Sequence, residues 1–108
     1  MVSRKKQILG HAATKPTVDE FLAVREQMNR TSVEFLKTDL ETALTFAKIA
    51  RQSRDSIRKN RNSLAARKGY ETLLRLVPKV ELGDDDGRIL ADGLNRLRAE
   101  LEALGETF

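Results

Sequence analysis

Cysteine is absent from this chain of 108 residues, and histidine occurs only once, at His11. Without cysteine the chain can form no disulfide, no thiol nucleophile and no cysteine-based zinc site. A single histidine likewise excludes a histidine-based metal site within one chain. We therefore expect neither a metal nor a cofactor.

Long apolar runs are also missing, since none approaches the roughly 18 residues that a membrane-spanning helix needs. The first residues carry the basic start of a signal peptide, but Ile8 and Leu9 are followed at once by Gly10 and His11 instead of an apolar stretch. The sequence therefore predicts a cytoplasmic protein with no membrane partner.

Aromatic residues make up only 5% of the chain, whereas charged residues make up 33% and hydrophobic residues 40%. The core must consequently consist mainly of leucine, valine and alanine. This balance is too apolar for general disorder and suits a thin helical protein with a large solvated surface. The length fits one domain.

Apolar residues recur at steps of three and four in three stretches, which is the spacing of a helix whose apolar side faces another helix. These residues are Val33, Leu36, Leu40, Ala43, Ala47 and Ala50, then Ala66, Tyr70, Leu73 and Val77, and finally Leu90, Leu94, Leu97, Leu101, Leu104 and Phe108. The pattern predicts an all-α fold, an antiparallel three-helix bundle over about 32–52, 56–77 and 86–104.

An extra N-terminal helix is predicted over about 17–30, because Thr17 and Glu20 have the spacing of a capping box. Thr31 and Glu34 repeat that spacing, so the chain could break there or continue as one helix. Residues 1–16 show no sustained period and are expected to form a flexible basic arm before a single helical domain over 17–108.

The third predicted helix resembles the second helix of a tetratricopeptide-type hairpin. Ala66, Tyr70 and Pro78 stand at the spacing of that family's small, aromatic and helix-ending proline positions. The helix that contains Leu40 and Ala47 would then be the first of the pair. The resemblance implies a scaffold that binds other proteins. More broadly, the arrangement is similar to short helical proteins of bacteria.

The helix over 32–52 has an unusually wide apolar surface, because Phe35, Phe46 and Ile49 lie beside its main apolar side. A helix that is apolar over so wide an arc needs cover on two sides. We interpret these residues, together with Phe21, as a surface for a protein partner or for self-association as a homodimer. The predicted function is therefore a non-enzymatic interaction or structural module.

Basic residues are concentrated in the middle of the chain: residues 51–80 contain nine basic and two acidic side chains, and residues 81–108 contain three and eight. A row of basic side chains could neutralise nucleic-acid phosphates, which makes nucleic-acid binding the alternative function. The other interpretation is a solvated face balanced by the acidic last helix. The candidate contact residues are Arg54, Arg58, Arg61, Lys68 and Arg75.

Consecutive acids at Asp84, Asp85 and Asp86 lack the alternating ligands of a calcium loop. They fit the start of a helix better, because carboxylates there interact favourably with the helix dipole. Tyr70, the only tyrosine, is expected in the core. No acids converge as a general acid–base pair would require, so the chain is not expected to be an enzyme.

Overall fold

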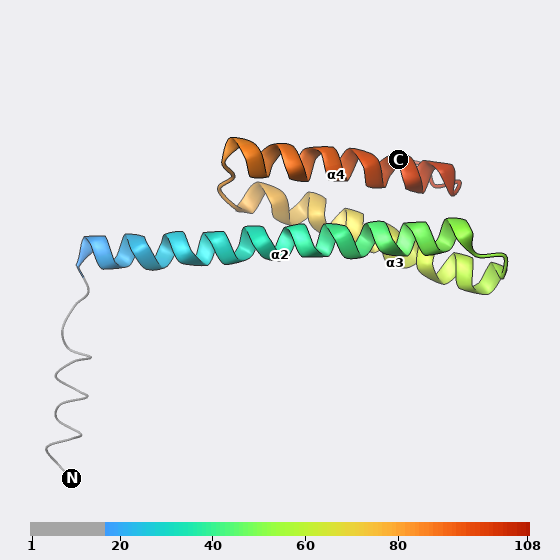
Figure 1. The fold of residues 1–108 in the computed structure, drawn as a ribbon, viewed down its shortest axis with the longest axis horizontal. Coiled ribbons are helices and arrows are strands. Elements are labelled where there is room, and N and C mark those ends of the chain that lie inside the picture. Colours follow the sequence, from blue (N-terminus) through green and yellow to red (C-terminus); the bar gives the residue numbers. More distant parts are fainter. Residues whose placement is uncertain (1–16) are drawn as a thin grey trace, which may run out of the picture.

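The computed structural model describes residues 17–108, which form three α-helices and one short 3₁₀ turn and, within this range, no strand (Figure 1). The helices are α2 (Val18–Gln52), α3 (Ser56–Leu76) and α4 (Asp84–Ala103), and the 3₁₀ turn η1 (Val77–Lys79) follows α3. The all-α class is therefore confirmed. The flexible arm expected over 1–16 lies outside the described residues.

Successive helices run in opposite directions, and α3 and α4 both lie along the C-terminal part of α2 (Figure 1). Their facing sides share one apolar cluster. Its buried members are Leu36, Leu40, Ala43, Ala47, Ala66, Tyr70, Leu73, Leu90, Leu97 and Leu101. All of them belong to the three apolar patterns that the sequence predicts.

The helix α2 is continuous, so the expectation of a separate helix over 17–30 is wrong. The second capping box is not used, because the helix does not begin at Thr31. The Thr31 hydroxyl instead donates to the carbonyl oxygen of Gln27, one turn earlier, at 3.0 Å. A threonine can bond in this way inside a helix without ending it. At 35 residues, α2 is about 52 Å long.

Helix ends follow local signals in the sequence. Thr17 and Glu20 form the capping box at the start of α2, and the Asp55 side chain accepts from the backbone N–H of Ile57 at the start of α3. After α4, Gly105 has a φ of +95°. The backbone N–H of Glu106 then donates to Leu101, which is the pattern of a glycine-terminated helix.

Phe108, which is 47% exposed, packs against Tyr70 at the edge of the core. The rings of Phe108 and Tyr70 meet edge to face, with their centroids 5.2 Å apart. Tyr70 is only 6% exposed, as expected for a core residue. The guanidinium groups of Arg67 and Arg98 lie 4.2 and 4.9 Å from the centre of the Phe108 ring, which closes this end of the core with cations over an aromatic face.

Candidate interaction surfaces

A second row of residues follows the solvent side of α2, separate from the row that faces the core. We call it the outer seam and define it as Phe21, Val24, Met28, Thr31, Phe35, Thr38, Thr42, Thr45 and Ile49. Its steps alternate between three and four residues, which is the spacing of a helix that packs along another helix. Every member is exposed, and Met28 and Phe35 are 65% and 64% exposed.

The four threonines of the outer seam have their hydroxyls bonded within α2. Each Oγ1 donates to the backbone carbonyl oxygen four residues earlier, at distances from 2.9 to 3.1 Å. A hydroxyl with a partner costs less to remove from water than a free one. Although threonine is a polar residue, a partner can therefore cover this surface without leaving the hydroxyl donors unpaired.

Of the predicted partner residues, three lie on this surface. Phe21, Phe35 and Ile49 are 59%, 64% and 38% exposed. Phe46, by contrast, is half-buried and packs against the core cluster next to α3. The structure therefore places Phe46 between the core and the outer seam. Val24 and Met28 complete the row but were missed among the site residues, although their spacing from Phe21 and Phe35 marks them.

The first turns of α2 extend beyond α3 and α4 (Figure 1). We call residues 18–31 the overhang. All of its residues are exposed except the partly covered Asn29. Its large apolar side chains, Val18, Phe21, Leu22, Val24 and Met28, are 49–73% exposed. Because these apolar side chains are exposed, tertiary packing contributes little to the stability of the overhang.

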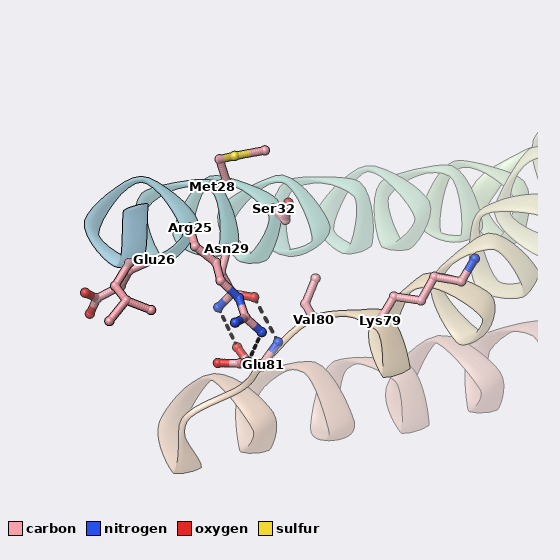
Figure 2. Close-up of a pocket in the computed structure, with 9 residues that line it drawn as sticks. Arg25, Glu26, Met28, Asn29, Ser32, Lys79, Val80 and Glu81 are labelled. Carbon is pink, nitrogen blue, oxygen red and sulfur yellow. Dashed lines mark hydrogen bonds and ion pairs between the residues drawn. The ribbon is translucent and has the colours of Figure 1, made fainter. Parts of the chain in front are cut away.

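One point of support is a contact with the connection between η1 and α4 (Figure 2). The Asn29 side chain donates to the carbonyl oxygen of Glu81 at 2.8 Å and accepts from its backbone N–H at 2.9 Å. Arg25 also reaches the Glu81 carboxylate, at 3.4 Å. Figure 2 shows that Arg25 and Asn29 point toward this connection, whereas Met28 points away from it.

The hollow between these elements is a groove of about 530 Å³ that opens to solvent. Arg25 and Glu81 both line it, and they pair with each other. Its lining includes two acids, Glu26 and Glu81, and no histidine or cysteine. Across residues 17–108 no three acidic, histidine or cysteine side chains are placed to hold a metal ion. The contacts within the groove position α2 against the connection between η1 and α4.

The predicted nucleic-acid residues lie on or beside α3 and are all exposed: Arg54, Arg58, Arg61, Lys68 and Arg75. We call these five the basic row. Among the ion pairs formed within residues 17–108, none includes a member of the basic row. Two acids near the C-terminal end of the chain, Glu100 and Glu106, pair instead with arginines outside the basic row. Arg51 meets Glu100 at 2.8 Å, and Arg67 meets Glu106 at 3.1 Å.

The three consecutive acids occupy the first turn of α4, where their charge interacts favourably with the helix dipole. Asp86 also forms an ion pair with Lys37 of α2, and Glu34 approaches the same amine at 3.1 Å. The hydrogen bond to Asp86 raises the pKa of Lys37 above its ordinary value of 10.5, and Glu34 adds to the effect. Asp86 therefore joins α4 to α2.

No family model, curated protein or solved structure matches this chain. The resemblance to a tetratricopeptide hairpin rests on this chain's own Ala66, Tyr70 and Pro78. Within residues 17–108, no helix combines the length and the apolar character needed to cross a membrane.

Proposed function

We propose that this protein is a non-enzymatic helical module that binds a protein through the outer seam of α2. The observation that carries the proposal is the seam itself, an exposed row at the spacing of helix–helix packing, with Phe21, Val24, Met28 and Phe35 at 59–65% exposure. Covering these side chains would remove a large apolar area from water, at about 25 cal/mol for each Å².

Two further observations support this proposal. The threonine hydroxyls of the seam are bonded within α2, so a partner can cover them without leaving a donor unpaired. The overhang presents its apolar residues without cover from α3 or α4 (Figure 1). We also propose that α2 and α3 form a tetratricopeptide-like hairpin and that the protein is cytoplasmic, as expected from the sequence.

A photo-crosslinking experiment tests it. A photoreactive amino acid is placed at Val24 or at Phe35, and for comparison at Ile89 of α4, which is 50% exposed but outside the seam. In native lysate, we expect positions 24 and 35 to give protein adducts and position 89 to give none. Absence of adducts at both seam positions, or equal adducts at position 89, would contradict the proposal.

A second candidate function is nucleic-acid binding through the basic row. The specific observation in its favour is that Arg54, Arg58, Arg61, Lys68 and Arg75 are exposed and take no part in the ion pairs formed within residues 17–108. Basic side chains that are not engaged in these ion pairs are available to contact phosphates. Such contacts give binding that is independent of sequence and weakens steeply with salt.

Salt titration with duplex DNA and duplex RNA tests this alternative. If the basic row binds phosphates, the double variant R61A/K68A lowers the slope of log affinity against log salt by about two. The matched control R88A/R96A removes the same charge from α4 and should leave the slope unchanged. Absence of binding by the unaltered protein at low salt would eliminate this candidate.

A further inference from the structure

We propose that the protein bound by the outer seam is a second copy of this chain. The two α2 helices run antiparallel, and the twofold axis passes between their outer seams at the level of Val33. This inference rests on the proposed function, because it names the partner of the same surface. In a twofold dimer, if residue i of one copy contacts residue j of the other, then j also contacts i. The pairing of the outer seam with itself must therefore be self-complementary.

The first evidence is the distribution of side-chain size along the outer seam. The large apolar residues Phe21, Val24 and Met28 stand on the N-terminal side of Val33, and three threonines stand on the C-terminal side. Antiparallel pairing about Val33 then places one bulky side chain opposite one threonine in every layer. The layers are Phe21 with Thr45, Val24 with Thr42, Met28 with Thr38, and Phe35 with Thr31 of the other copy.

The second evidence is the charge on either side of the outer seam. In this alignment Arg25 stands opposite Asp39 of the other copy, and Glu20 stands opposite its Lys48. Twofold symmetry makes each of these pairs twice. Asp39 and Lys48 take no part in the ion pairs formed within residues 17–108, and Arg25 has there only the exposed contact with Glu81 at 3.4 Å. Oppositely charged residues that flank a helix–helix seam set its orientation and partner.

Other alignments lose this complementarity. Moving the pairing by one heptad brings Glu20 opposite Glu41 in one direction, or Glu34 opposite Glu41 in the other. Parallel pairing would bring Glu34 opposite Asp39 and Glu20 opposite Arg25, so that one repulsive pair offsets one attractive pair. Each of these places like charges together, which is unfavourable beside a helix–helix seam. The antiparallel alignment about Val33 is the one that these charges favour.

In this alignment the Glu34 side chains of the two copies lie close to each other at the twofold axis. Each Glu34 carboxylate already has a cation beside it, because the Lys37 amine lies 3.1 Å away. The two Glu34–Lys37 pairs reduce the repulsion across the axis. The net effect along the interface therefore remains attractive.

The shape of the molecule fits the same arrangement. The overhang extends past α3 and α4, whereas the part of α2 after Val33 is backed by them (Figure 1). Antiparallel pairing lays the overhang of each copy along the supported part of the other copy's α2. Each copy thus supplies the cover that the other copy's overhang lacks, and the exposed residues Phe21, Val24 and Met28 are buried by the same contact.

Spin-label distances test both association and orientation. The chain has no cysteine, so single labels can be placed at S32C, near the axis, and at Q52C, at the end of α2. For the antiparallel dimer we expect a short distance between the two labels at position 32. The two labels at position 52 should be about 57 Å apart, measured along the direction of the α2 helix axes. Short distances at both positions would show parallel pairing and overturn the proposal.

Charge reversal supplies an independent test by sedimentation equilibrium. We expect D39R and R25D each to weaken dimerisation by about tenfold, because each replaces two attractive pairs by two repulsive ones. The double variant R25D/D39R restores opposite charges and should regain most of the affinity. A role of these residues in folding alone would give no such rescue.

A protein that stays monomeric at every concentration would overturn this inference. The proposed function would survive that result if positions 24 and 35 still crosslinked to a different protein. Failure of the double variant to recover affinity would contradict the proposed alignment.

Discussion

Gly69 and Gly93 stand where neighbouring helices approach closely. A methyl group added at Gly69 would lie 2.9 Å from the Ala43 side chain of α2, and one added at Gly93 would lie 2.2 Å from Leu40. Ala43 is buried and its side chain is a single carbon fixed to the backbone, so it cannot turn aside. The spacing between α2 and α3 therefore depends on Gly69.

We predict that Gly69→Ala destabilises the fold by roughly 1 kcal/mol. Alanine favours the helix by about 1 kcal/mol, but overpacking a closely packed site costs about 1–3 kcal/mol. The control is Gly87→Ala in the first turn of α4, where the nearest atom to the new methyl is 3.9 Å away. That variant should be more stable than the unaltered protein. Urea unfolding measures both, and equal stabilisation by the two changes would contradict the close contact.

Lys37 provides a pH-dependent contribution, because Asp86 and then Glu34 raise its pKa above 10.5. The folded state therefore holds the proton more tightly than the unfolded state. The resulting stability is fully present below pH 10.5 and is lost as the pH rises through the higher pKa of the folded state. We predict that Lys37→Met is less stable than the unaltered protein at pH 8 and that this difference shrinks above pH 11.

Denaturant unfolding at several pH values measures that difference. Lys59→Met is the matched control, because Lys59 is exposed on α3 and takes no part in the ion pairs formed within residues 17–108. Its effect on stability should be small at both pH values. A difference for Lys37→Met that stays constant up to the highest pH would refute the role of the ion pair.

The helix α2 differs along its length in what supports it. After Val33 its buried side packs on α3 and α4, whereas the overhang is held by its capping box and by Asn29. The two hydrogen bonds of Asn29 satisfy both backbone groups of Glu81. This contact joins two segments that are far apart in the sequence, so it fixes the direction in which the overhang leaves the rest of the fold.

We predict that Asn29→Ala loosens the overhang and releases the Glu81 amide. The loss of two hydrogen bonds should cost about 1–2 kcal/mol locally. Glu26→Ala is the control, because Glu26 is an exposed residue of the overhang that takes no part in the ion pairs formed within residues 17–108. Amide hydrogen exchange should speed up in residues 18–31 for the first variant and change little for the second. Equal exchange in both variants would contradict the support by Asn29.

The sequence predicts the core-facing sides of the helices well, because leucine and alanine at three- and four-residue steps have few other interpretations. Helix ends with a strong signal, such as Pro78 and Gly105, were also predictable. The continuity at Thr31 was not, since its capping-box pattern is the same as the one at Thr17. The two threonines differ in the structure by their hydrogen bonds. The Thr17 hydroxyl accepts from the backbone N–H of Glu20 and caps the helix, whereas the Thr31 hydroxyl donates to the carbonyl oxygen of Gln27 inside it.

The candidate site was predictable only in part. Phe21 and Phe35 stand out as large apolar residues away from the core pattern. The four threonines of the outer seam were hidden because threonine counts as polar, and the hydrogen bonds of their hydroxyls to the helix backbone become visible only in the structure. Phe46 was misplaced for a related reason, because the sequence alone does not show how far α3 reaches around α2.

Two exposed surfaces of residues 17–108 stand out once the helices have packed. One is the outer seam with its overhang, and the other is the basic row on and beside α3. The acidic C-terminal segment pairs with Arg51 and Arg67, which lie outside the basic row. The acidic residues near the C-terminal end therefore neutralise only part of the positive charge of residues 51–80. The basic row stays exposed to solvent.

Hydrogen exchange along α2, followed as the protein concentration is raised, tests directly whether the outer seam pairs with itself. We predict that protection of residues 18–31 increases with concentration, because a second copy covers the overhang. In Val24→Asp this increase should disappear, whereas the off-seam control Ile89→Asp should keep it. Exchange that does not depend on concentration, or the same concentration dependence in Val24→Asp and the unaltered protein, would contradict the central claim that the outer seam pairs with itself.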